Sequence, residues 1–114
     1  MAKKLEGKVV VVTGAGSPVG IGKEVALAMA AEGAKVVVND IGKDADGKYG
    51  ADRIVKMIKD AKGTAVANYD SVASMEGGRK IVKSAIDAFG QLDVLVNTAG
   101  NFHVAPTVDY AEKD

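Results

Sequence analysis

Apolar residues gather in four short runs along the chain, and longer segments with a helical spacing lie between them. The first run, KVVVVT at residues 8–13, has four consecutive valines and no polar face. A strand without a polar face is typical of a parallel sheet that is covered on both sides. Three later runs are also short and mainly apolar. Strands are therefore predicted at residues 8–13, 35–39, 64–68 and 92–97.

The intervening segments carry apolar residues at spacings of three and four, which predicts helices at residues 20–32, 51–61 and 75–89. Gly33, Gly63 and Gly90 follow these helices and favour their termination. The alternation predicts an α/β fold, a Rossmann-like doubly wound parallel sheet of about four strands and three helices. No further element is predicted after Gly100, where Pro106 interrupts the remaining sequence. The fourth strand is then expected to present an unpaired edge, through which the chain would self-associate.

Length and composition restrict the class of protein. A chain of 114 residues is at most one domain, and we assign residues 1–114 to that single domain. Basic and acidic residues number 15 each, which argues against nucleic acid as the main partner. The sequence has no cysteine, one histidine and no apolar run of membrane-spanning length, so we expect no metal site and no membrane partner. A cytoplasmic location is the matching expectation.

The most informative segment is the turn that joins the first strand to the first helix, TGAGSPVGIG at residues 13–22. Such a turn places backbone N–H groups and a helix N-terminus against a dinucleotide pyrophosphate. Gly14 would permit the tight turn, Gly20 would let the backbone approach phosphate, and Gly22 would let helix and strand pack closely. Ser17 and Ile21 complete the predicted contacts in this turn. The alternatives are a Gly14-x-Gly16-x-x-x-Gly20 pattern and a glycine-rich turn without a ligand.

Asp40 ends the second strand, 18 residues after Gly22. A carboxylate at this place accepts hydrogen bonds from the adenosine ribose and repels a 2′-phosphate. Neither Val19 nor Ile41 is basic, which favours NAD, whereas the proximity of Lys43 keeps NADP as the less favoured cofactor. The alternative is that Asp40 is only a turn residue.

These motifs resemble the short-chain dehydrogenase/reductase family. The family pattern is TG, three residues and G-x-G, whereas five residues stand between Gly14 and Gly20 here. The resemblance implies that Asp70 meets the adenine ring. It also implies that Asn97, Thr98, Ala99 and Gly100 form the counterpart of an N-N-A-G motif along the cofactor, with Thr98 in place of the second asparagine. The resemblance covers nearly the whole chain.

The resemblance implies an NAD-dependent oxidoreductase that transfers hydride between nicotinamide and an alcohol or carbonyl of a small-molecule substrate. The segments VVVND, AVANYDSV and FGQLDVLVNTAG are most similar to those of hydroxyacyl-CoA dehydrogenase domains of peroxisomal multifunctional proteins. Family catalysis implies a serine and Tyr-x-x-x-Lys, and none of the three tyrosines starts that motif. No catalytic residue is therefore predicted, and the chain is expected to be the cofactor-binding part of a homo-oligomeric enzyme. The alternatives are a non-catalytic nucleotide-binding or partner subunit and an inert half-fold.

Overall fold

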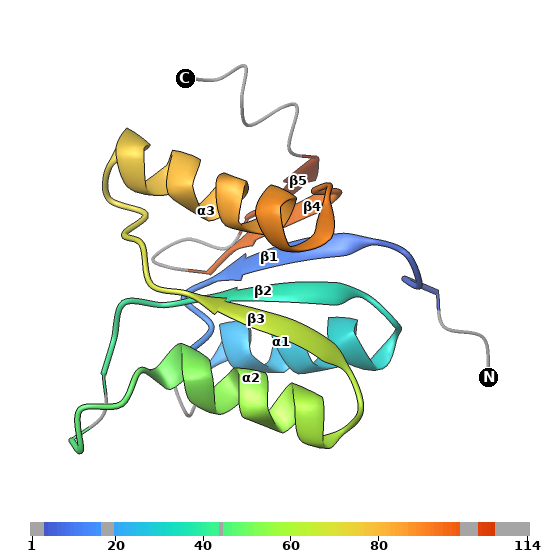
Figure 1. Cartoon of the computed structure of the whole chain (residues 1–114), viewed down its shortest axis with the longest axis horizontal. Helices are drawn as coiled ribbons and strands as arrows, with labels where there is room; N and C mark the ends of the chain where they lie inside the picture. Colours follow the sequence, from blue (N-terminus) through green and yellow to red (C-terminus); the bar gives the residue numbers. More distant parts are fainter. Residues whose placement is uncertain (1–3, 17–19, 44, 99–102, 107–114) are drawn as a thin grey trace.

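A computed structural model describes residues 4–16, 20–43, 45–98 and 103–106. Strands and helices alternate through most of these ranges (Figure 1). In chain order they are β1 (Val9–Thr13), α1 (Ile21–Ala31), β2 (Lys35–Asn39), α2 (Gly50–Asp60), β3 (Thr64–Asn68), α3 (Met75–Phe89), β4 (Val94–Asn97) and β5 (His103–Pro106). The predicted elements are confirmed, except that β4 begins two residues later than expected and that β5 was not predicted.

The strands form one sheet in the order β3-β2-β1-β4-β5. The pairs β1–β2, β2–β3 and β1–β4 are parallel. Helices α1 and α2 cover one face of the sheet, and α3 covers the other (Figure 1). The chain leaves β1 in one direction through β2 and β3, and returns to the opposite side of β1 as β4. This reversal of strand order is the switch point at which doubly wound sheets bind ligands.

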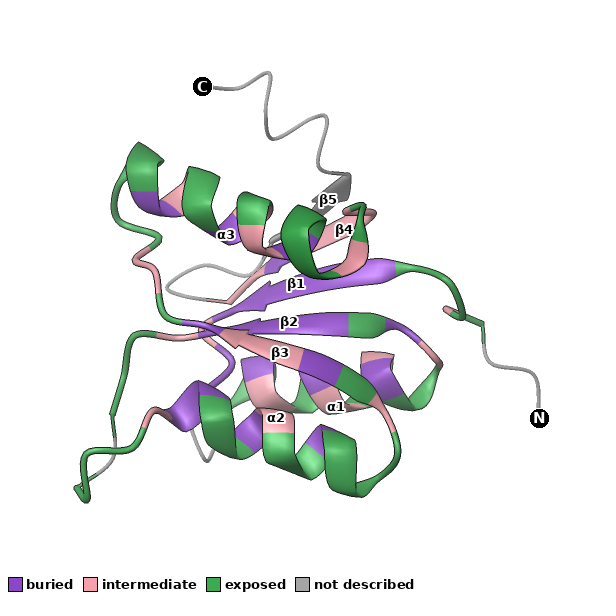
Figure 2. Ribbon diagram, in the orientation of Figure 1, coloured by how far each residue is buried: buried purple, intermediate pink, exposed green. Residues whose placement is uncertain are grey.

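Alternate valines of the central strands serve two separate cores. Val10 and Val12 pack with the buried residues of α1 and α2, whereas Val9 and Val11 pack with Ile81 and Ala85 of α3. Successive side chains of a strand point to opposite faces, so an unbroken valine run supplies both cores. Figure 2 shows the resulting buried band through β1 and β2. The two-sided burial read from the sequence is confirmed.

The outer edge of β4 is paired, because β5 lies antiparallel beside it. Val94 aligns with Pro106 and Asn97 aligns with His103. The prediction of an unpaired β4 edge is therefore wrong, and self-association through residues 92–97 loses its basis. As the outer strand, β5 tolerates a proline, which lacks a backbone N–H. A run of four residues that ends in proline gives too weak a pattern for its pairing to be predicted.

Asp93 fastens the start of β4 to the start of β1. Its Oδ2 accepts hydrogen bonds from the backbone N–H of Val9 at 2.8 Å and from Gln91 Nε2 at 2.8 Å. The Val9 hydrogen bond lowers the pKa of the Asp93 carboxyl, with smaller help from Gln91 and the charge of Lys8. The carboxylate therefore stabilises the fold above the unfolded pKa of about 3.9, and this stability disappears as the pH falls through the folded pKa.

An Asp93→Asn variant is expected to be less stable than wild type at pH 7. When the pH falls below 4, the variant should lose less stability than wild type does. Urea midpoints between pH 2 and pH 7 measure both effects. Asp60→Asn is the matched control, because the Asp60 carboxylate forms an exposed ion pair with Lys56. If Asp93→Asn lost as much stability as wild type between pH 7 and pH 2, this role of Asp93 would be contradicted.

Candidate functional site

Each of the four parallel strands ends in a polar residue, and these residues form one row across the sheet. Thr13 of β1 aligns with Asn39 of β2 and with Asn97 of β4, and Asn39 aligns with Asn68 of β3. Thr13, Asn39 and Asn68 are buried. The row therefore closes the carboxyl edge of the apolar sheet with hydrogen-bonding side chains.

Hydrogen bonds connect the row internally and to the loop after β3. Thr13 Oγ1 donates to Asn97 Oδ1 at 2.9 Å. Asn39 Nδ2 donates to Asn68 Oδ1 at 2.8 Å and to the Asp70 carbonyl at 2.9 Å. Asn68 Nδ2 in turn donates to Asp70 Oδ2 at 2.9 Å. The half-buried Asp70, predicted to meet adenine, is thus fixed from both its backbone and its side chain.

An Asn39→Ala variant is expected to lose about 1–3 kcal/mol of unfolding free energy, because the buried Asn68 Oδ1 and the half-buried Asp70 carbonyl each lose a donor. Urea denaturation measures the loss. Thr64→Ala, at the exposed opposite end of β3, is the control and should change stability by less than about 0.5 kcal/mol. Equal effects of the two substitutions would show that the row does not stabilise the fold.

The glycine turn brings three predicted glycines to the N-terminus of α1. Gly14 and Gly20 have positive φ angles of 67° and 139°, which favour glycine. A Cβ on Gly22 would lie 2.6 Å from the Gly14 carbonyl oxygen and 2.5 Å from Thr98 Oγ1. Gly22 therefore allows the close helix–strand packing that the sequence predicts. Ile21 is 63% exposed beside the turn.

Sequence reasoning did not include Gly16 and Gly50 among the site residues. A Cβ on Gly16 would lie 2.7 Å from the backbone nitrogen of Ala51 and 2.7 Å from Asp40 Cβ, and a Cβ on Gly50 would overlap the Gly16 carbonyl oxygen. The backbone of the glycine turn at Gly16 therefore packs directly against the backbone at the start of α2. The alternative glycine pattern contained Gly16, but no sequence signal pointed to Gly50.

Asp40 links the glycine turn to the loop after β2. Its Oδ2 accepts from the Gly16 N–H at 2.9 Å, and its Oδ1 accepts from the Gly42 N–H at 2.8 Å. The backbone N–H of Asp40 donates to the Asn68 carbonyl at 3.1 Å. Asp40 is half-buried. The carboxylate is thus oriented beside the turn, as the prediction of a ribose acceptor requires.

Thr98 closes the site at the end of β4. Its backbone N–H donates to the Thr13 carbonyl at 3.3 Å, and its hydroxyl donates to the same oxygen. The structure therefore brings Asn97 and Thr98 to the glycine turn. The other predicted members, Ser17, Ala99 and Gly100, lie outside the described residues.

A groove of about 1020 Å³ runs from Thr13 and Asn97 along α3. Leu95, Val82 and Ile86 contribute apolar side chains to it. It therefore leaves room for a ligand or a further chain segment next to the switch point.

Tyr69 is poorly suited to proton transfer at neutral pH. The Tyr69 hydroxyl donates to the Asp52 carboxylate, and this hydrogen bond is the main reason that the pKa of Tyr69 rises to about 12. Burial and the negative charge of Asp52 act in the same direction. The arrangement can bind and orient a nucleotide, but Tyr69 supplies no acid or base at neutral pH.

Among the described residues, no helix is both long and apolar enough to cross a membrane. No group of three or more acidic or histidine side chains in the same ranges could hold a metal ion. The described site consists of backbone, amide, hydroxyl and carboxylate groups.

Comparison with known proteins connects this geometry to a family. The family model described as short chain dehydrogenase matches residues 8–114. The chain is 55% identical over 104 residues to peroxisomal multifunctional enzyme A of Dictyostelium discoideum, covering 88% of this chain and 22% of that protein. It is 50% identical over 101 residues to peroxisomal multifunctional enzyme type 2 of Mus musculus, covering 85% and 13%.

Solved structures agree with this assignment. A short chain dehydrogenase from Mycobacterium avium has a TM-score of 0.78 and 48% identity, over 85% of this chain and 36% of that one. A 7α-hydroxysteroid dehydrogenase in complex with NADH and 7-oxo glycochenodeoxycholic acid has a TM-score of 0.72 and 40% identity, over 82% and 34%. The chain thus spans 36% or less of each of these four proteins. On these matches the chain belongs to the short-chain dehydrogenase family.

Proposed function

We propose that this chain binds NAD and forms the cofactor-binding part of an NAD-dependent oxidoreductase. The observation that carries the proposal is the position of the Asp40 carboxylate, which is hydrogen-bonded to the glycine turn at 2.9 Å. A carboxylate has about four acceptor positions, and backbone N–H groups of Gly16 and Gly42 use two of them. The others can accept the ribose hydroxyls, and the negative charge disfavours a 2′-phosphate.

The turn and α1 fit a pyrophosphate. The N-cap residue Gly20 has no side chain that could cap α1, and its positive φ lets the backbone approach a ligand closely. The N-terminus of a helix attracts anions through its N–H groups and its dipole. Gly14, Ile21 and Gly22 would line the same place, and Ser17 is proposed to contribute to it.

Two further groups would hold the remaining parts of the cofactor. Asp70, fixed by Asn39 and Asn68, would meet the adenine ring. Asn97 at the switch point, with Ala99 and Gly100 as predicted neighbours, would lie along the cofactor. The 7α-hydroxysteroid dehydrogenase among the similar structures is a complex with NADH, which supports a nicotinamide cofactor here.

When bound, the nicotinamide cofactor supplies the hydride acceptor or donor. We propose that the complete protein oxidises or reduces a small alcohol or carbonyl substrate and that hydroxyacyl-CoA thioesters are the substrate class. The resemblance to hydroxyacyl-CoA dehydrogenase domains suggests this class. The 114-residue sequence contains no Tyr-x-x-x-Lys, so this chain is proposed to bind and orient the cofactor rather than to transfer the proton.

The complete gene product tests the proposed reaction. We expect NADH absorbance at 340 nm to rise when the protein is mixed with NAD+ and a 3-hydroxyacyl-CoA. Binding of NAD+ without oxidation of this thioester or of a panel of secondary alcohols would overturn the enzymatic proposal in favour of a non-catalytic nucleotide-binding subunit. Absence of NAD+ binding would overturn both.

Assembly and location are separate proposals. We propose a homo-oligomer, which sedimentation of the complete protein would test, and a cytoplasmic location, which imaging of the tagged protein would test. The word peroxisomal in the names of the two multifunctional relatives makes a peroxisome the alternative that imaging must distinguish.

A further inference from the structure

The loop after β2 is closed on itself and holds Lys43 beside Tyr49. Gly50 N–H donates to the Gly42 carbonyl at 3.0 Å, and Lys43 and Tyr49 form an isolated antiparallel bridge. Because the loop starts at Asp40 and the Gly42 N–H donates to the Asp40 carboxylate, this closure also fixes the carboxylate. The lysine is thus anchored three residues from the proposed ribose acceptor.

The side chain of Lys43 is engaged by an aromatic ring. Its Nζ lies 4.8 Å from the centroid of the Tyr49 ring, within the range of a cation–π contact. The Tyr49 ring also stacks on Tyr69, with ring centroids 4.1 Å apart and an interplanar angle of 30°. The described basic residues between Asp40 and Tyr49 are Lys43 and Lys48, and this contact joins Lys43 to the stacked Tyr49–Tyr69 pair.

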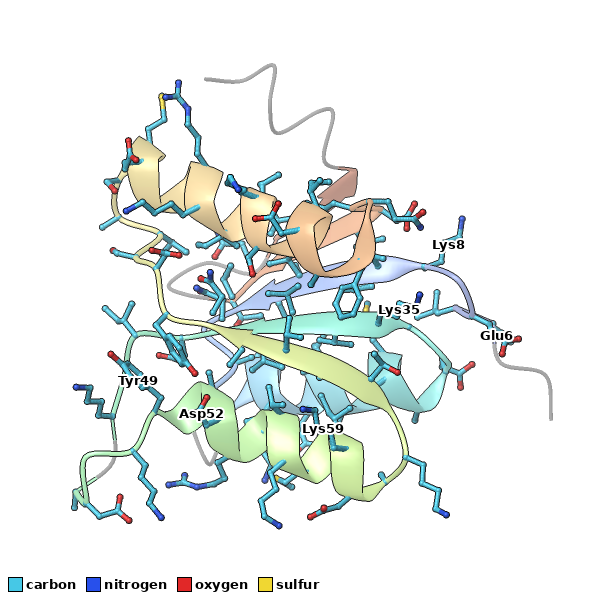
Figure 3. All side chains as sticks on the ribbon, in the orientation of Figure 1. Glu6, Lys8, Lys35, Tyr49, Asp52 and Lys59 are labelled. Carbon is cyan, nitrogen blue, oxygen red and sulfur yellow. The ribbon has the colours of Figure 1, made fainter. Side chains whose placement is uncertain are left out.

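The aromatic pair is anchored to two elements of the fold. Tyr69 follows β3, and its hydroxyl donates to Asp52 in the first turn of α2. Tyr49 is the N-cap residue of α2, and Figure 3 shows Tyr49 and Asp52 at the same end of this helix. Tyr49 is half-buried, whereas Lys43 is exposed. Movement of the Tyr49 ring therefore requires loss of packing, whereas Lys43 needs only to leave the ring.

We propose that Tyr49 is a cofactor-specificity residue, which keeps Lys43 away from a 2′-phosphate and so favours NAD over NADP. This inference rests on the proposed function, because it concerns the same adenosine site. A lysine near the ribose would otherwise offset the repulsion between Asp40 and the phosphate. Discrimination would then have two parts, the negative charge of Asp40 and the retention of Lys43 by the Tyr49 ring.

The test compares dissociation constants for NAD+ and NADP+ in wild type, Tyr49→Leu, Tyr49→Phe and Tyr49→Leu/Lys43→Met. Tyr49→Leu should raise NADP+ affinity relative to NAD+ by about two- to fivefold, the change that matches loss of an exposed cation–π contact. Tyr49→Phe keeps the ring and should keep the wild-type ratio. The double variant should return to the wild-type ratio, because the freed ammonium is gone.

Two controls separate the lysine from general changes in the loop. Lys48→Met removes another positive charge from the same loop. Added to Tyr49→Leu, it should leave the ratio of NADP+ to NAD+ affinity of that variant unchanged. The gain in NADP+ affinity should shrink at high salt, because salt screens an exposed ion pair. Circular dichroism checks that each variant is folded.

The outcomes distinguish this inference from the proposed function. Wild type that binds neither dinucleotide would overturn the proposed function and this inference with it. Wild type that prefers NAD+, together with a Tyr49→Leu ratio equal to wild type, would overturn this inference alone. Equal ratios in Tyr49→Leu and the double variant, both different from wild type, would also overturn it, because the effect would not pass through Lys43.

Discussion

Gly22→Ala is expected to lower the free energy of unfolding by about 1–3 kcal/mol, the usual cost of overpacking a well-packed site. The added Cβ would lie 2.6 Å from the Gly14 carbonyl oxygen and 2.9 Å from Ala15 Cα. Both are backbone atoms of the glycine turn, so the clash cannot be relieved by a side-chain rotation. The turn would have to move away from α1, and NAD+ affinity should fall with it. Urea denaturation and an NAD+ titration measure the two effects.

Gly78→Ala is the matched control in α3. A Cβ at Gly78 would have no atom within 4 Å, and alanine is the better helix former. The control should therefore gain up to about 1 kcal/mol of stability. Similar stability of the two variants would contradict the close packing of α1 against β1.

Asp40→Ala is expected to weaken NAD+ binding by about 1.5–3 kcal/mol, or roughly 10- to 150-fold. The variant loses the charged acceptor for the ribose hydroxyls and the repulsion of a 2′-phosphate. NADP+ affinity should therefore fall less than NAD+ affinity. Calorimetric titration of both dinucleotides measures the difference.

The Asp40 experiment needs a control for structure, because the carboxylate also accepts from Gly16 and Gly42. Asp40→Asn keeps one neutral oxygen acceptor and should reduce NAD+ binding with a smaller loss of stability. Asp46→Ala removes an exposed carboxylate from the same loop and should leave NAD+ binding unchanged. Unchanged NAD+ affinity in Asp40→Ala would remove Asp40 from the site.

The parallel part of the fold was predictable because its signals are local. The valine runs of β1 and β2 indicate strands buried on both faces, and the apolar spacing of α3 indicates a helix with one buried face. The antiparallel strand β5 was not predictable in this way. Its residues acquire strand geometry by pairing with β4, and the short segment has no strong pattern of its own.

The residues of the candidate site were predictable where a single residue type is required for a specific contact. Gly22 meets the requirement for close packing, and Asp40 lies at the carboxyl end of β2 beside the turn. The crossing of Gly16 and Gly50 depends on contacts between segments far apart in sequence, so no local pattern contains it. The Asn39–Asn68 contact likewise depends on strand register, although the polar residue at the end of each valine-rich strand was a usable signal.

The most direct test of the account is a calorimetric titration of the chain with NAD+ and, separately, with NADP+. We expect saturable binding of one NAD+ per chain and weaker binding of NADP+, because the Asp40 carboxylate accepts ribose hydroxyls and repels a 2′-phosphate. Tighter binding of NADP+, or no binding of either dinucleotide by the folded chain, would contradict the assignment of an NAD site at the glycine turn.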